Sequence, residues 1–183
     1  MHMKHILPIL TLTTLAAAAS AQAAAAAPAG LSYNRVSVSR EGQNNTVSAS
    51  ALLGGTNVLA SVSSGNGYNS STTFSLGYVF KNVAFATDAT VSVSSGNKDL
   101  NSAVSVNLRR ALNEVYAGLE VAVGYSYASN SDTGFYADPA GTTGVVTAEL
   151  AYNINKTWQV AAGITNVNPS SDRVTTVSVR HNF

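Results

Sequence analysis

The sequence predicts an all-β fold, namely an antiparallel up-and-down β-barrel whose strands cross a membrane. Polar and apolar residues alternate through a series of short segments, as they do when successive side chains of a strand point to opposite faces. Charged residues make up only 10% of the chain, against ~25% in soluble domains, yet no run after the leader reaches the ~20 apolar residues of a membrane helix. The connections alternate between short turns and longer loops, which is typical of outer-membrane barrels.

Residues 1–27 are expected to form a signal peptide that precedes the barrel. Lys4 gives a positively charged start, an apolar stretch too short to span a membrane follows, and small residues with A-x-A patterns come last. Cleavage near Ala21 to Ala27 would leave residues 28–183 as one barrel domain. The leader predicts export through the inner membrane, and the barrel pattern predicts residence in the outer membrane of a Gram-negative cell envelope.

Ten strands are expected, separated by clusters of Gly and Asn. Their predicted ranges are 31–39, 46–53, 57–64, 72–80, 83–94, 102–112, 115–128, 143–154, 157–167 and 173–183. In the first strand Tyr33 and Val36 fall on opposite faces, which predicts a bulge. The second and third ranges are short for the ~9–11 residues that a tilted strand needs to cross the hydrocarbon layer, so eight strands are the alternative. The short turns are expected at 54–56, 81–82, 113–114 and 155–156.

From the fourth strand to the ninth, one face of each strand is almost entirely apolar. In chain order the apolar positions are Phe74, Leu76, Tyr78 and Phe80; Val83, Phe85, Ala89, Val91 and Val93; Val104, Val106 and Leu108; Val115, Ala117, Leu119, Val121, Val123, Tyr125 and Tyr127; Val146, Ala148, Leu150, Tyr152 and Ile154; and Trp158, Val160, Ala162 and Ile164. The opposite faces carry mostly Ser, Thr, Gly, Ala and Asn. The one charge in phase with the apolar faces is Arg110, close to a strand end, where its side chain can reach the interface.

A soluble barrel would turn its apolar face inward, and periodicity alone does not separate the two arrangements. The low charge and the position of the aromatic residues toward strand ends favour an apolar face that points outward to lipid. The residues expected to form an aromatic girdle at the membrane interfaces are Tyr78, Phe80, Tyr125, Tyr127, Tyr152 and Trp158.

Six charged residues fall in mid-strand on the polar faces. They are Arg35, Asp88, Arg109, Glu120, Glu149 and Arg180. At ~3.3 Å per residue their depths differ by less than about 10 Å, a gap that an Arg side chain can bridge. Charges withdrawn from water must be paired, and the equal numbers of the two signs predict an ion-pair network across the part of the lumen near the short turns. The network would stabilise and plug a narrow barrel, or alternatively act as the gate of a small polar pore.

The last strand alternates up to a terminal aromatic residue. Val177, Val179, His181 and Phe183 share its mainly apolar face. This ending resembles the C-terminal signature of bacterial outer-membrane barrels, although that family more often has an aromatic or apolar residue where His181 stands. The resemblance implies recognition by the barrel-assembly machinery. The architecture of the whole mature chain resembles the small outer-membrane barrels of the OmpA and OmpX kind, without any family-specific functional motif.

The predicted function is a structural or surface-interaction role for a small outer-membrane barrel with a largely plugged lumen, in contact with outer-membrane lipids and an unidentified extracellular partner. The alternative is a narrow porin-like channel for ions or small polar solutes. An enzyme is not expected, because the chain has no Cys and its only His after the leader, His181, points outward. No catalytic residue, metal ligand set or cofactor site is predicted. Without Lys4 the chain keeps nine basic residues against nine acidic ones, so a nucleic-acid partner is not expected either.

Overall fold

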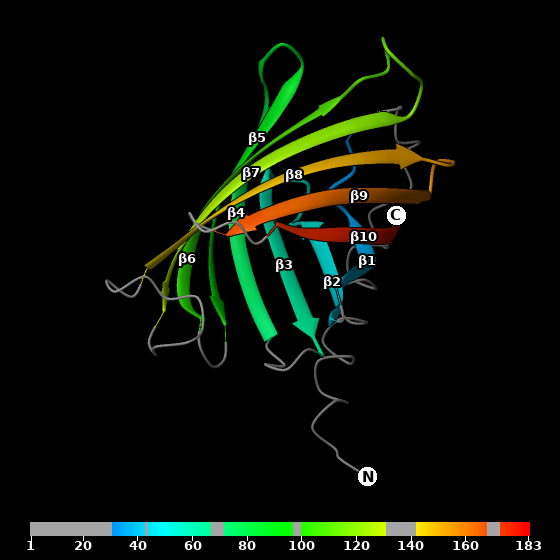
Figure 1. Cartoon of the computed structure of the whole chain (residues 1–183). Helices are drawn as coiled ribbons and strands as arrows, with labels where there is room; N and C mark the ends of the chain where they lie inside the picture. The colour runs from blue at the N-terminus through cyan, green and yellow to red at the C-terminus, as the bar shows by residue number, and fades with distance from the viewer. Residues whose placement is uncertain (1–30, 43, 67–71, 97–99, 131–141, 168–172) are drawn as a thin grey trace.

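The structure, a computed structural model, describes residues 31–42, 44–66, 72–96, 100–130, 142–167 and 173–183. Over these residues it contains ten antiparallel strands that close into a barrel, because each strand pairs with its neighbours in the chain and β1 pairs with β10 (Figure 1). The strands are β1 (Arg35–Glu41), β2 (Asn44–Leu52), β3 (Val58–Gly65), β4 (Thr72–Ala84), β5 (Thr87–Gly96), β6 (Leu100–Ala111), β7 (Leu119–Asn130), β8 (Thr142–Asn153), β9 (Trp158–Val167) and β10 (Arg173–Asn182). In this described part, no helix is long and apolar enough to cross a membrane.

The predicted fold class and the count of ten strands are confirmed. β2 and β3, which look short in the sequence, have 9 and 8 residues and pair with each other from Thr46↔Gly65 to Leu52↔Leu59. The eight-stranded alternative is therefore wrong. The predicted signal peptide lies outside the described residues and stays a prediction.

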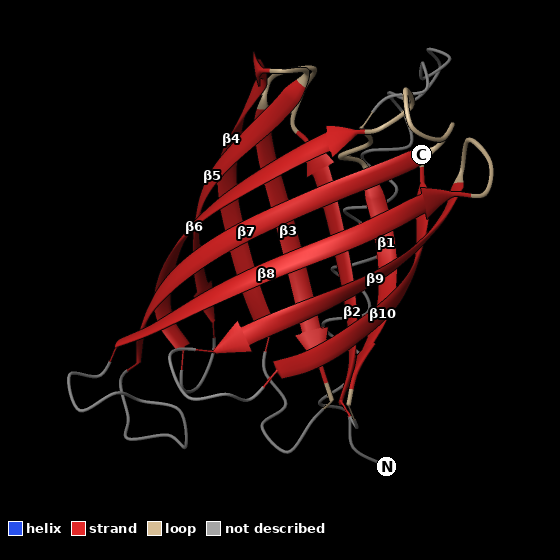
Figure 2. Ribbon diagram, turned by 45° about the horizontal axis from the view of Figure 1, so that its top comes forward, coloured by secondary structure: helices blue, strands red, loops and turns tan. Residues whose placement is uncertain are grey.

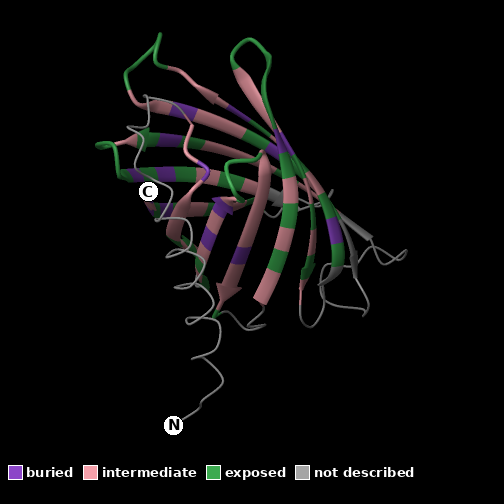
Figure 3. Ribbon diagram, turned by 180° about the vertical axis from the view of Figure 1, so that it is seen from behind, coloured by how far each residue is buried: buried purple, intermediate pink, exposed green. Residues whose placement is uncertain are grey.

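Exposed and buried residues alternate along the strands, as the banded ribbon in Figure 3 shows. On β4 the outward side chains of Phe74, Leu76 and Tyr78 are all about half exposed, whereas Val79 is fully buried on the lumen side. A soluble protein rarely exposes so many large apolar side chains in one continuous band. The band is the one that a barrel presents to lipid, with its polar side chains turned toward the lumen.

The short connections after β2, β4, β6 and β8 lie at the same end of the barrel as the C-terminus (Figure 2). We call this the turn end, formed by residues 53–57, 85–86, 112–118 and 154–157. The opposite end, where β1, β3, β5, β7 and β9 finish, is called the loop end. Phe183 N donates to Asn34 O at 3.1 Å, so the two ends of the barrel domain meet at the turn end.

Two turns differ from the sequence prediction. The turn expected at Lys81-Asn82 lies at Phe85-Ala86 instead, because β4 continues to Ala84 across a register shift after Phe80. The cause is a side chain: Asn82 N donates to Asp88 Oδ1 at 2.8 Å, which holds the bulged segment against the start of β5. Val83 and Phe85 therefore do not belong to β5.

The second difference is the connection between β6 and β7. Val115 and Ala117 continue the alternation of β7 in the sequence, but residues 112–118 form a compact turn. Tyr116 N donates to Leu112 O at 3.0 Å, and Gly118 takes a positive φ of 85° that ends the turn. Alternation alone does not distinguish such a turn from a strand. Val115 and Ala117 are apolar and exposed, as outward residues of a strand would be, although they belong to the turn.

The bulge predicted in the first strand is also absent. β1 begins at Arg35 and keeps regular register with β2 and β10 through Glu41. Tyr33 precedes the strand and points into the lumen together with Arg35, while Val36 points outward. The phase conflict in the sequence therefore marks an inward-pointing aromatic side chain and not an extra residue.

Candidate functional site in the barrel lumen

Small hydroxyl side chains cover much of the lumen face. Ser37 and Ser48 share a hydrogen bond of 2.6 Å across neighbouring strands, and Ser61 and Ser75 share another. Side chains of this size leave a cavity of ≈ 480 Å³ inside the barrel, and Ser and Thr make up 12 of its 25 lining residues. The charged residues that line it are Arg35, Arg109, Glu149 and Arg180.

Arg109 on β6 and Glu120 on β7 form a buried ion pair near the turn end. Arg109 Nη2 lies 3.0 Å from Glu120 Oε2, and the two side chains are only 8% and 5% exposed. Glu120 Oε1 accepts a second hydrogen bond, of 2.7 Å, from Asn153 Nδ2, and Arg109 Nη1 donates to Ser32 O at 3.0 Å. Both charges are thus compensated by charged and neutral partners, which a buried ion pair requires.

Arg180 on β10 and Glu149 on β8 form the second pair. Arg180 Nη1 donates to Glu149 Oε1 at 2.7 Å, and Nη2 contacts Oε2, so the contact is bidentate. Two amides connect this pair to the first one: Arg180 Nη1 donates to Gln159 Oε1 at 3.1 Å, and Gln159 Nε2 donates to Asn153 Oδ1 at 2.9 Å. One hydrogen-bonded network therefore runs from β6 to β10.

Tyr33 carries the network across the lumen. Its hydroxyl donates to Asp88 Oδ2 at 2.8 Å, and the Arg109 guanidinium lies 4.9 Å from its ring centroid. β1, which follows Tyr33, is opposite β6 in the strand order of the barrel, so these contacts span its full width. Burial, together with the hydrogen bond to Asp88, raises the pKa of the Tyr33 phenol, which keeps the hydroxyl protonated as a donor.

Buried side chains gather in the lumen near the turn end. Tyr33, Arg109, Glu120, Gln159 and Arg180 are all buried, although four of the five are polar enough to prefer water. We call these five residues, with Asp88, Asn153 and Glu149, the charged layer. Four of its members, Tyr33, Arg109, Glu149 and Arg180, also line the cavity.

The structure brings four of the six predicted lumen charges into ion pairs, but not the other two. Asp88 stands in cross-strand register with Arg109, yet its carboxylate accepts from Tyr33 and from the backbone of Asn82. Arg35 lines the cavity, and its buried Nη1 has no hydrogen-bond partner among the described residues. Among the described residues, the six charges are therefore not all joined in ion pairs.

Sequence reasoning missed three members of the charged layer: Tyr33, Asn153 and Gln159. The signal was present, since Gln159 interrupts the small residues of its face and Tyr33 is out of phase with the outward residues of its strand. In the described residues, no group of three His, Asp or Glu side chains is arranged to hold a metal ion.

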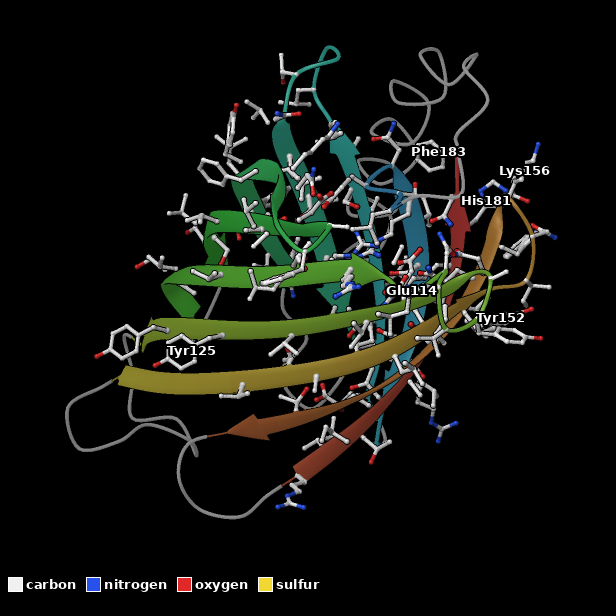
Figure 4. All side chains as sticks on the ribbon, turned by 90° about the horizontal axis from the view of Figure 1, so that it is seen from above. Glu114, Tyr125, Tyr152, Lys156, His181 and Phe183 are labelled. Carbon is white, nitrogen blue, oxygen red and sulfur yellow. The ribbon has the colours of Figure 1, made fainter. Side chains whose placement is uncertain are left out.

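Most of the large apolar residues predicted for the outer surface are exposed where the structure describes them. The six aromatic residues of the expected girdle are exposed, and Figure 4 shows Tyr125 and Tyr152 projecting outside the wall near opposite ends of the barrel. Val177 and Val179 are exposed on β10, and His181 packs edge-on against Trp158 at 4.9 Å between ring centroids. Outside the lumen, Arg110 pairs with Glu114 at the turn end.

No family model and no curated protein matches this chain. Solved structures do match it. The NanC porin has a TM-score of 0.51 at 8% sequence identity, and the match covers 81% of this chain and 98% of that one. The KdgM porin matches with a TM-score of 0.46 at 17% identity, covering 84% and 99% of the two chains. The Acinetobacter baumannii outer membrane protein Omp33 has a TM-score of 0.44 at 13% identity, covering 84% and 100%. At such identities the likeness concerns the fold: this chain forms a closed antiparallel β-barrel of the porin-like kind.

Proposed function

We propose that this chain is an integral outer-membrane β-barrel with a narrow, gated lumen through which ions or small polar solutes pass. The observation that carries the proposal is the cavity of ≈ 480 Å³ that small Ser and Thr side chains keep open in the lumen. Larger side chains at these positions would fill the space and stabilise the barrel through better packing. An open polar volume is therefore better explained by the passage or binding of a solute than by stability.

The charged layer is the proposed gate. In the present conformation it closes the turn end, so passage requires a side chain to move away. Stability alone does not explain charges there, because buried ion pairs exchanged for apolar residues of similar volume often leave a protein as stable or more stable. Displacement of the Tyr33 side chain would open the lumen, since its contacts with Asp88 and Arg109 span it.

A second candidate function is a permanently plugged barrel with a structural or surface-interaction role. The observation that favours it is the near-complete burial of Arg109 and Glu120 and their connection to Arg180 through Asn153 and Gln159. Neither function requires catalysis, and we do not propose an enzyme.

The remaining proposals concern how the barrel reaches and sits in the membrane. Residues 1–27 would act as a signal peptide, and the strand ending in Val177, Val179, His181 and Phe183 would be read by the barrel-assembly machinery, as in the small barrels of the OmpA and OmpX kind that the sequence resembles. Lipids of the outer membrane would contact the apolar outer face, with the exposed aromatic residues at its two borders.

The test is the single-channel conductance of the refolded protein in a planar bilayer, for the wild type, Arg109→Ala and Tyr33→Ala. Arg110→Ala is the matched control, because Arg110 is adjacent in sequence but pairs with Glu114 outside the lumen. Small openings of the wild type that become larger or more frequent in the two lumen variants support the gated channel. A silent wild type with conducting variants supports the plugged barrel. If every variant is silent although heat-modifiable migration shows a folded barrel, the channel proposal is refuted.

A further inference from the structure

We infer that the lumen cavity is a binding site for small oxyanions, carboxylates or phosphates, centred on Arg35. The inference deepens the proposed function, since an anion site inside a conducting lumen also makes the lumen prefer anions over cations. The binding itself does not depend on conduction.

The Arg35 side chain lies in the wall of the lumen cavity. Arg35 faces Ser50 on β2 and Asn182 on β10, and it lines the cavity. Its Nη1 is buried without a hydrogen-bond partner among the described residues, and none of the ion pairs recorded there includes it. A buried donor left without an acceptor is costly, and more so when it is charged. An anion in the cavity, bound to the part of the Arg35 side chain that lines it, would compensate this buried charge.

The neighbouring carboxylates of Glu149 and Glu120 already have partners. Glu149 is held at both oxygens by Arg180. Glu120 binds Arg109 with one oxygen and Asn153 with the other. Neither carboxylate can turn to Arg35 without breaking a buried ion pair, so the charge of Arg35 stays available to a ligand.

The cavity wall carries more positive than negative side chains. Three guanidinium groups line the cavity, on Arg35, Arg109 and Arg180, against the single carboxylate of Glu149. Asp88 and Glu120 are not part of this wall. A low-dielectric lumen wall with an excess of positive charge raises the local concentration of anions and lowers that of cations.

The geometry of the donors and the size of the cavity define the class of ligand. A guanidinium presents its N–H groups in a planar fork that matches the two oxygens of a carboxylate or phosphate. Ser92 and Ser105, which face each other across β5 and β6, also line the cavity and offer hydroxyls to such a ligand. With ≈ 480 Å³, the cavity lies within the ~300–1,000 Å³ of small-molecule sites, so it suits a small solute and not a polymer held entirely inside.

The first experiment measures binding with inorganic phosphate as the probe. The urea midpoint of the folded barrel in detergent micelles is followed while phosphate replaces chloride at constant ionic strength, for the wild type, Arg35→Gln, Arg35→Lys and Arg40→Gln. Arg40 is the matched control because it lies on the same strand but is exposed. Phosphate should raise the midpoint of the wild type and of Arg40→Gln. In Arg35→Gln the apparent affinity for phosphate should fall about tenfold or more, since a charge-assisted hydrogen bond is lost, and Arg35→Lys should retain part of it.

Arg35→Gln also has an expected effect without phosphate. Because it removes a charge whose buried Nη1 has no hydrogen-bond partner among the described residues, it should fold at least as well as the wild type, which heat-modifiable migration checks. Equal phosphate responses of the wild type and Arg35→Gln would overturn the inference.

The second experiment measures the reversal potential in a KCl gradient for the same four proteins. The wild type should prefer Cl⁻ over K⁺, and Arg35→Gln should lose most of this preference while Arg40→Gln keeps it. A conducting wild type whose selectivity is the same in Arg35→Gln contradicts the role of Arg35 in selectivity. A barrel that is silent but whose phosphate response depends on Arg35 refutes the channel and supports the anion site, so the two proposals fail separately.

Discussion

Replacing Glu120 with Gln removes the carboxylate of the buried Arg109–Glu120 ion pair while keeping the shape of its side chain. The Arg109 guanidinium would lose its contact of 3.0 Å with a charge, and it is only 8% exposed. The new amide has one oxygen, so it can accept from either Arg109 or Asn153 but presents an N–H group to the other. The variant therefore leaves a charge and a polar donor unsatisfied in a site that water reaches poorly.

The loss of stability in Glu120→Gln depends on the contacts that Arg109 retains. Removing one partner of a buried ion pair costs about 3–5 kcal/mol, mainly because the other charge is left uncompensated. Arg109 would still donate to Ser32 O at 3.0 Å and lie over the ring of Tyr33 at 4.9 Å. The expected loss is therefore near the lower bound, about 3 kcal/mol, which lowers the ratio of folded to unfolded barrel about a hundredfold.

The assay is equilibrium urea unfolding in detergent micelles, followed by the fluorescence of Trp158, the only Trp of the chain. Glu114→Gln is the matched control, because the partner of Glu114 is Arg110, which is adjacent to Arg109 in the sequence. The side chains of Glu114 and Arg110 are 53% and 37% exposed, so the change in stability should not be measurable. The double variant Arg109→Met with Glu120→Leu should recover most of the loss, because no charge is left alone. If Glu120→Gln is as stable as Glu114→Gln, or if the double variant is less stable than Glu120→Gln, the account of the charged layer is refuted.

Three further variants test other parts of the barrel by the same unfolding assay. Ala86→Gly should stabilise the barrel by about 0.5–1 kcal/mol. Ala86 has a φ of 55°, which costs a non-glycine residue ~1–2 kcal/mol, and the greater freedom of glycine in the unfolded chain offsets part of the gain. An unchanged unfolding midpoint would contradict this expectation. Gly77→Ala should destabilise it by about 1–3 kcal/mol, since a Cβ would lie 2.7 Å from Ser92 Cβ; an unchanged midpoint would show that the two strands can separate freely. Tyr33→Phe should cost about 1.5–3 kcal/mol through the lost hydrogen bond to Asp88. Because the pKa of Tyr33 is raised above its usual value of 10.0, this stabilisation is complete below pH 10 and declines at higher pH. A difference in unfolding free energy between the wild type and Tyr33→Phe that grows above pH 10 would contradict the role of the Tyr33 hydroxyl as a donor.

Much of the fold is predictable because the alternation of side chains and the alternation of loop lengths both follow from the closed barrel. The ranges of β2, β8, β9 and β10 differ from the prediction by two residues or fewer at each end. The turns are less predictable where the deciding contact comes from elsewhere in the sequence. The β4–β5 turn moves because the carboxylate of Asp88 binds the backbone of Asn82, and no local pattern at residues 81–86 contains that information.

The lumen is predictable in composition but not in contacts. Phase alone places Arg109, Glu120, Glu149 and Arg180 on the inner face near one end of the barrel, and the structure pairs all four. Which acid meets which base depends on the stagger between strands, and the sequence does not reveal it. Asp88 illustrates this, because it is in direct register with Arg109 but binds a tyrosine that enters from the opposite side of the barrel.

The inverted arrangement of a membrane barrel explains why its lumen says more about function than its outer face does. The closed ladder of strands and the contact of the outer face with lipid supply the stability, so the inner face is not required to form an apolar core. Inner residues that do not satisfy one another are then informative. The charged layer satisfies itself through ion pairs, amides and Tyr33. Arg35 is different, because its Nη1 has no hydrogen-bond partner among the described residues and its side chain borders an open cavity. Arg35 and the cavity beside it are not needed for the stability of the barrel. A solute bound in the lumen explains them most directly.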